Sequence, residues 1–246
     1  MLIGMRNAML AGGDLSAKSY VQDGLVAMWD GIENAGWGTH DSSATIWKDL
    51  AGNRDATLVN GGGFDSNSLT NSNASNTPAW FSSPISAADS RTVEVVILPV
   101  TPQPQTLNLF VVAGGTMMEN ADKVVTSREG LYGCGVLTAG GSVWFGNSDI
   151  YKSPVNQAFS ASYDYSSKTA YENGIVVAGE QRQDGYTTYS YGNRSRVPSI
   201  GGFAPNSTAN NVFIGHIFCI RYYSRALTAA EVAANYAVDK ARFNLA

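Results

Sequence analysis

Few residues of this chain could carry catalysis, and their spacing fits none of the common mechanisms. Retaining glycosidases need two carboxyl groups about 5–5.5 Å apart, and residues at alternating positions of one strand point to the same face. None of the seven glutamates has an acidic residue two positions away. Glu94 stands among apolar residues, and Glu119 and Asp122 are three positions apart. Hydrolysis of glycosides by such a pair is therefore the least favoured activity.

Nucleophilic catalysis and metal binding have equally little support. The chain has two histidines, His40 and His216, and no G-x-S-x-G sequence that would present a serine nucleophile. We interpret His216 as structural, because it lies inside an apolar run, and we expect no cofactor. Bound calcium stays open as an alternative, because one loop carries the oxygen ligands that this ion prefers. Those ligands would be Asp30, Glu33, Asn34 and Asp41.

Two loops, Gly31–Ser43 and Asp184–Arg196, combine aromatic rings with hydrogen-bonding groups. An aromatic face can stack on the apolar face of a sugar ring, while Asn, Asp or Arg bonds its hydroxyls. The predicted ligand-binding residues are Trp37, His40, Asp41, Tyr189, Tyr191, Asn193 and Arg194. The alternative is that the tyrosines of the second loop belong to an ordinary, half-buried strand.

Composition favours many short strands joined by turns. Of 246 residues, 15% are charged and 26 are glycine, which is typical of sheet rather than helix. The net charge of −4 disfavours nucleic acid, whose phosphates require clustered Lys and Arg. No apolar run approaches the roughly 18 residues of a membrane-spanning segment. Cys134 and Cys219 lack CxxC spacing, so we expect two buried thiols.

Turn signals and apolar runs divide the chain into about twelve to fourteen strands. Asn173-Gly174 predicts a type I′ hairpin turn. Thr228 and Glu231 form a capping box at the start of a helical pattern. The predicted fold is all-β: an antiparallel two-sheet jelly-roll sandwich with one short C-terminal helix.

The C-terminal strand and helix share a set of packing and capping residues: Gly215, Ile217, Ile220, Arg221, Tyr223, Arg225, Ala226, Leu227, Glu231, Asn235, Tyr236, Asp239, Arg242 and Phe243. With these residues, the segment resembles the end of a laminin-G-like domain of the concanavalin A-like lectin and glucanase superfamily. GLVAMWDG (24–31) and WKDLAGNRDATL (47–58) are similar to the first strands of such domains in bacterial surface and phage proteins. The resemblance implies one sandwich domain over residues 21–246, of a kind that often holds calcium at its rim.

Residues 1–20 precede this resemblance and are predicted to form an N-terminal arm. Gly4, Arg6 and Asn7 interrupt the apolar core that a signal peptide needs, so no signal peptide is recognised. The arm could dock on another chain and give a homo-oligomer or a larger assembly. These features favour a virion or the extracellular surface as the location.

The sequence as a whole predicts a non-enzymatic binding module for carbohydrate or another cell-surface polymer, which could be the exposed head of a larger assembly. The resemblance, the missing pair of carboxylates and the two aromatic loops favour this function. The alternative is a phage virion protein, a decoration or fibre component without a ligand of its own. A glycoside hydrolase is the third and least favoured function. Neither nucleic acid nor membrane insertion is expected.

Overall fold

The computed structural model describes residues 15–59, 61–72, 79–81, 92–99, 106–112, 122–128, 133–138, 141–146, 159–164, 169–176, 182–184, 199–201 and 213–245. Seventeen strands, one 3-10 helix and one α-helix are assigned within these ranges, which confirms a mostly β fold with a C-terminal helix. The strands outnumber the prediction because several are pieces of two or three residues. None of the helices in these ranges is long and apolar enough to cross a membrane.

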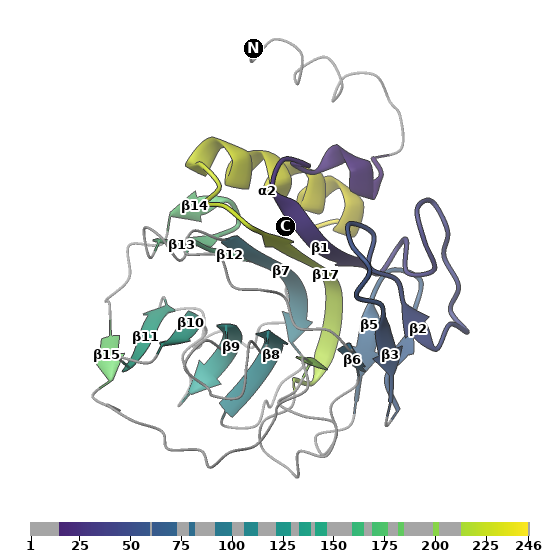
Figure 1. Cartoon of the computed structure of the whole chain (residues 1–246), viewed down its shortest axis with the longest axis horizontal. Coiled ribbons are helices and arrows are strands. Elements are labelled where there is room, and N and C mark those ends of the chain that lie inside the picture. The colour runs from purple at the N-terminus through teal and green to yellow at the C-terminus, as the bar shows by residue number, and fades with distance from the viewer. Residues whose placement is uncertain are drawn as a thin grey trace.

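The largest sheet is built around two long neighbouring strands, β7 (Thr92–Pro99) and β17 (Gly215–Tyr223). They pair antiparallel over their length, with one register shift in β17. Outside β7 follow β12 (Phe159–Asp164), β13 (Thr169–Glu172) and β14 (Ile175–Val176). The other edge of β17 pairs with β1 (Leu25–Asp30) and with β5 (Leu69–Asn71), which is followed by β4 (Gly63–Phe64). Figure 1 shows the sheet curled like half of a barrel.

Two further sheets complete the described strands. The six-stranded sheet contains, in spatial order, β2 (Ile46–Trp47), β3 (Ala56–Leu58), β6 (Ala79–Phe81), β16 (Ser199–Ile200), β8 (Thr106–Val112) and β9 (Asp122–Arg128). The three-stranded sheet contains β10 (Gly133–Thr138), β11 (Gly141–Gly146) and β15 (Arg182–Asp184). Because strands pair in three sheets and the largest is curled, a jelly roll of two sheets is not confirmed.

The C-terminal helix, α2 (Ala229–Phe243), begins and packs as the sequence predicts. The Thr228 hydroxyl accepts from the Glu231 amide at 3.3 Å, and the Glu231 carboxylate accepts from the Thr228 amide at 2.8 Å. Both bonds of the capping box are therefore present. Helix α2 lies along the outer side of the large sheet, and β8 to β11 lie on the opposite side of that sheet (Figure 1).

The predicted hairpin turn between β13 and β14 is also confirmed. Asn173 has φ 49° and Gly174 has φ 76°, the positive values that both central residues of a type I′ turn require. A Cβ atom on Gly174 would lie 3.0 Å from the Tyr236 side chain. The turn therefore needs glycine both for its backbone conformation and for its close approach to α2.

A short segment before β1 packs into the domain. It contains the 3-10 helix η1 (Ala17–Ser19), and both Ala17 and Tyr20 are buried in a cluster that includes Val238 and Phe243 of α2. Figure 1 shows η1, in purple, beside α2. Residues 1–14 lie outside the described ranges, so the division into an arm of residues 1–20 and a domain of residues 21–246 stays a prediction.

The capping glutamate should make stability depend on pH. Hydrogen bonds from Arg225, at 2.7 and 3.0 Å, are the main cause that lowers the pKa of Glu231 to about 2. Because this pKa is lowered in the folded state, the stabilisation is present above the unfolded pKa of about 4.3 and is lost as pH falls toward 2. We expect Glu231→Gln to reduce the free energy of unfolding by under about 1 kcal/mol at pH 7.

Denaturant titrations of both proteins between pH 7 and pH 2.5 check this expectation. Glutamine can still complete the capping box, so the difference isolates the charge of Glu231. The two proteins should become equally stable as pH falls through the range from 4.3 to 2. A stability difference that stays constant down to pH 2.5 would contradict the role assigned to the carboxylate.

Candidate functional site

The first predicted loop exposes an aromatic ring. We call Gly31–Ser43, which follows β1, the Trp37 loop. The Trp37 side chain is 39% exposed, whereas Trp29 and Trp47 on either side of the loop are fully buried. Among the large apolar side chains that the structure shows as exposed, Trp37 is the one aromatic ring. An exposed indole beside polar groups is suited to stacking on a ligand.

The buried base of the Trp37 loop holds its tip in one conformation. The Glu33 carboxylate, which is 4% exposed, accepts from the Gly38 amide at 2.8 Å. The fully buried Asn34 side chain bonds both backbone groups of Asp41, at 2.7 and 2.8 Å. Gly38 has φ 68°, in the left-handed region that favours glycine. The loop therefore presents Trp37 from a fixed backbone.

The other predicted residues of this loop lie close to Trp37 in sequence and are exposed. His40 Nδ1 lies 3.1 Å from the Gly31 carbonyl oxygen. The Asp41 carboxylate accepts from the Ser43 amide at 2.8 Å and from its hydroxyl at 2.6 Å. These bonds hold the pKa of Asp41 below its ordinary value. Trp37, His40 and Asp41 thus share one ordered, solvent-facing loop.

The structure does not bring together all the residues that the sequence singled out. Tyr189, Tyr191, Asn193 and Arg194 lie outside the described residues, so their relation to Trp37 stays a prediction. Of the side chains considered for calcium, Asp30 and Glu33 both bond the Arg242 guanidinium, whereas the Asn34 amide bonds the Asp41 backbone. Within the ranges that the structure describes, no group of three acidic, histidine or cysteine side chains could hold a metal ion.

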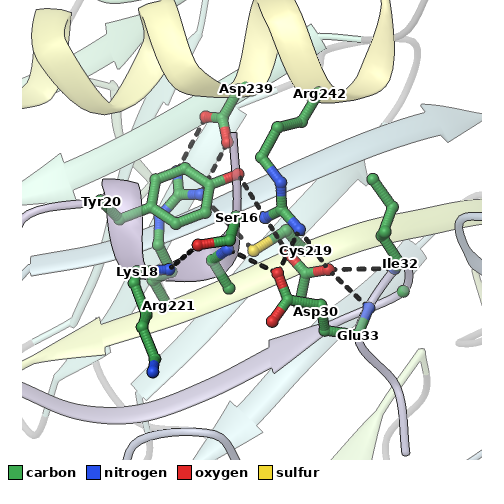
Figure 2. A network of polar contacts seen from close by, with 12 residues as sticks. Ser16, Lys18, Tyr20, Asp30, Ile32, Glu33, Cys219, Arg221, Asp239 and Arg242 are labelled. Atoms are coloured by element: carbon green, nitrogen blue, oxygen red, sulfur yellow. Dashed lines mark hydrogen bonds and ion pairs between the residues drawn. The ribbon is translucent and has the colours of Figure 1, made fainter. Parts of the chain in front are cut away.

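Beneath helix α2 lies a buried ionic network centred on Arg221 (Figure 2). Its guanidinium donates to Glu94 at 2.8 Å and to both carboxylate oxygens of Asp239, at 2.6 and 2.8 Å. The Tyr20 ring lies 4.0 Å from the guanidinium carbon. Burial by itself lowers the pKa of Arg221, but Asp239 and Glu94 outweigh it and raise this pKa well above its ordinary value. The network therefore joins α2 to the large sheet through a permanent positive charge.

A second arginine connects this region to the Trp37 loop. The Arg242 guanidinium donates to Asp30 at 3.1 Å and to Glu33 at 3.0 Å. The same Glu33 oxygen also accepts from the Ala17 amide, at 2.6 Å. Figure 2 shows Asp30 and Glu33 both facing Arg242. Glu33 therefore joins helix α2, the segment before β1 and the tip of the loop.

The two tyrosines of the network are structural. A phenol can act as a nucleophile in glycoside cleavage only if it is reachable and can lose its proton. Tyr20 and Tyr223 are almost fully buried, and burial is the main cause that raises the pKa of both phenols. Asn235 donates to the Tyr223 oxygen at 3.0 Å. These contacts stabilise the packing of α2 on the sheet.

A serine, a histidine and an aspartate meet at the turn between β4 and β5, a group that their spacing in the chain does not indicate. His216 Nδ1 lies 3.0 Å from the Ser68 hydroxyl and 3.0 Å from an Asp65 oxygen. A catalytic triad requires the serine and the acid on different ring nitrogens. Both contacts of His216 use Nδ1, and Asp65 also accepts from the Asn67 and Ser68 amides. The group therefore stabilises a turn, in agreement with the structural role predicted for His216.

Cys219 is a buried free thiol, as predicted. It lies on β17 at the centre of the core, and burial is the main cause that raises its pKa well above the ordinary value. The side chain of Cys134 is not among those that the structure describes, so the second thiol stays a prediction.

Solved structures with a similar fold include sialidases. A Trypanosoma rangeli sialidase in complex with sialic acid matches with a TM-score of 0.54 and 15% identity, over 87% of this chain and 32% of that chain. The same enzyme as a covalent intermediate with 2,3-difluorosialic acid matches with a TM-score of 0.53, 15% identity and the same coverage. At this identity the likeness defines the class of fold alone, a strand-rich domain that occurs within sialidases. The chain spans about a third of the length of those enzymes.

The other comparisons assign the chain to no family and add nothing to the class of fold. The carbohydrate-binding module (CBM40) of a Ruminococcus gnavus IT-sialidase, bound to α2,6-sialyllactose, matches with a TM-score of only 0.43 and 16% identity, over 62% of this chain and 84% of that chain. That score is too low to define a shared fold. No protein-family model and no curated protein matches the sequence. The laminin-G-like resemblance and the phage alternative are therefore not supported by these comparisons.

The prediction that the chain is not an enzyme is contradicted, because sialidases, which are enzymes, are among the solved structures with a similar fold. That prediction relied on the missing pair of carboxylates on one strand. Sialidases are an exception to the two-carboxylate rule, because they use a tyrosine nucleophile. The absence of such a pair therefore does not separate binding domains from enzymes in this class of fold.

Proposed function

We propose that this chain is a carbohydrate-recognition domain that binds glycan through the Trp37 loop. The observation that carries the proposal is an exposed Trp37 ring on a loop fixed from below by buried Glu33 and Asn34. A rigid aromatic platform binds well because little conformational entropy is lost on binding. His40 and Asp41 lie on the same loop and supply hydrogen-bonding groups for sugar hydroxyls.

The fold adds independent support for glycan as the ligand class. The matched Trypanosoma rangeli sialidase is described in complex with sialic acid, and strand-rich domains present loops suited to recognition. A loop that binds sugar is equally compatible with a domain that works alone and with one that serves a catalytic part. The proposal therefore concerns the ligand of the Trp37 loop and leaves the activity of the whole protein to experiment.

We further propose the finer features that the sequence predicts. The fold is of the laminin-G-like, jelly-roll type, and the protein acts at the extracellular surface or in a virion. Residues 1–20 contribute to assembly with other chains. Tyr189, Tyr191, Asn193 and Arg194 form a second contact for the same glycan. A phage structural protein without a ligand is the weaker alternative, since it leaves the exposed Trp37 without a role.

Replacing Trp37 should remove most of the binding. We expect Trp37→Ala to weaken the affinity for glycan at least about 30-fold, because an aromatic ring at the centre of a contact typically contributes about 2 kcal/mol. Trp37→Phe retains a stacking ring and should lose only a few-fold. A glycan array with the wild-type domain identifies the ligand, and calorimetric titration with that glycan then measures each affinity.

The matched control is Ile175→Ala, which removes a side chain that is 72% exposed at the edge strand β14. Its affinity should equal that of the wild type, and the thermal midpoints of all variants should agree, since none of the changes affects a buried side chain. A wild-type domain that binds no glycan, or full affinity in Trp37→Ala, would show that the proposed function is wrong.

A further inference from the structure

The segment before β1 places a positive charge beside the exposed indole. Lys18, in the 3-10 helix η1, is exposed, and its ammonium nitrogen lies 5.3 Å from the centre of the Trp37 ring. Within the described residues no carboxylate pairs with Lys18, whereas Lys48 bonds Asp55 at 2.6 Å. The chain as a whole has a net charge of −4. The Lys18 ammonium is nevertheless a local positive charge that a ligand can contact, because it is exposed and pairs with none of the described carboxylates.

One buried carboxylate fixes both segments that carry this pair. Glu33 accepts from the Ala17 amide at 2.6 Å through one oxygen and from the Gly38 amide at 2.8 Å through the other. These amides belong to the residues next to Lys18 and Trp37 in the sequence. Lys18 and Trp37 are therefore neighbours because the Glu33 carboxylate bonds the backbones of both segments.

We propose that Lys18 and Trp37 form one subsite for a negatively charged sugar, a proposal that rests on the proposed function of the Trp37 loop. The indole stacks on the apolar face of the sugar ring, and the ammonium group binds a carboxylate or sulfate on the same ring. A cationic ligand is disfavoured, because the Lys18 ammonium lies 5.3 Å from the ring centre and repels a second positive charge. A neutral sugar gains the stacking contact but not the ionic one.

Each of the two carboxylates described near this subsite already has hydrogen-bonding partners. Glu33 is buried and bonded to Arg242 at 3.0 Å, and the exposed Asp41 carboxylate is bonded by the amide and hydroxyl of Ser43. Among the residues that the structure describes, Lys18 is therefore the charged side chain next to the ring that is open to an anion. Glu33 acts as a positioning residue, because it holds the backbones rather than contacting the ligand.

The test compares sugars that differ only in the substituent at carbon 6. Galacturonic acid-terminated and galactose-terminated glycans form the carboxylate pair. Glycans that end in 6-sulfogalactose, which carries a sulfate ester at carbon 6, form the sulfate pair with the galactose-terminated glycans. The wild type should bind the charged member of at least one pair more tightly, by up to about fivefold, and added salt should reduce this ratio. Lys18→Gln should abolish the ratio, and Lys18→Arg should retain it.

The control Lys240→Gln removes an equal charge from an exposed position of α2 and should leave the ratio unchanged. Equal ratios in wild type and Lys18→Gln, or equal losses in both glutamine variants, would overturn the inference. If Trp37→Ala weakens binding while Lys18→Gln keeps the ratio, only the inference fails. If Trp37→Ala binds both sugars as the wild type does, the inference fails together with the site on which it rests. A wild type that binds other glycans of the array but none of these three overturns the inference alone.

Discussion

Arg221→Met is expected to lower the free energy of unfolding by about 3–5 kcal/mol. Glu94 and Asp239 are at most 1% exposed, and both bond the Arg221 guanidinium. Removing one partner of a buried ionic group leaves the other charges without compensation in a low-dielectric interior, which is the reason for this loss. Denaturant titration followed by circular dichroism measures the change.

The matched control for this prediction is Arg225→Met. Arg225 also bonds a carboxylate bidentately, that of Glu231, but both side chains are more than a quarter exposed. A solvent-exposed pair typically contributes at most about 1 kcal/mol. Similar losses in the two variants would mean that the network under α2 does not behave as a buried ionic group.

Arg242→Met should destabilise the protein by a similar amount, about 3–5 kcal/mol, and should also loosen the Trp37 loop. The change leaves Asp30 and Glu33, both buried, without the guanidinium that bonds them. Glu33 accepts from the Gly38 amide, so a displaced Glu33 carboxylate frees that amide. Hydrogen exchange of Gly38, measured by NMR under conditions where the variant stays folded, should become faster.

Lys240→Met serves as the control, because Lys240 lies two residues away on the same helix and is exposed. It should change neither stability nor the exchange of Gly38 appreciably. If Arg242→Met lowers stability but Gly38 exchanges at the wild-type rate, the loop is held independently of helix α2. In that case Glu33 would no longer be the connection between the network and the proposed site.

Local features of the fold could be predicted from the sequence because short-range contacts determine them. The capping box needs only Thr228 and Glu231, three positions apart, and the hairpin turn needs only Asn173 and Gly174. The alternation and turn signals likewise favoured strands through most of the chain. Which strands pair could not be predicted, because β17 pairs with β1, β5 and β7 across long stretches of sequence. The curled sheet therefore appears only in the structure.

The C-terminal residues that suggested the fold have a role that the pattern did not reveal. Arg221, Asn235, Asp239 and Arg242 were expected to pack or cap, and their side chains form buried polar contacts instead. The main acceptor of Arg221 outside its own segment, Glu94, is 127 positions away. A lone acidic residue in an apolar strand indicates a buried partner, but only the tertiary structure identifies which arginine it is.

In the candidate site, too, the sequence predicts some features and only the tertiary structure determines the others. The sequence by itself placed Trp37, His40 and Asp41 in one glycine-rich loop, because adjacency in the chain guarantees adjacency in space. It could not separate Trp37 from Trp29 and Trp47, since exposure depends on what the rest of the chain covers. Only the folded chain buries those two rings, leaves the Trp37 ring in solvent and places Lys18 beside it. The physical reason is that Glu33, a single buried carboxylate, holds two backbones that the sequence keeps about twenty residues apart.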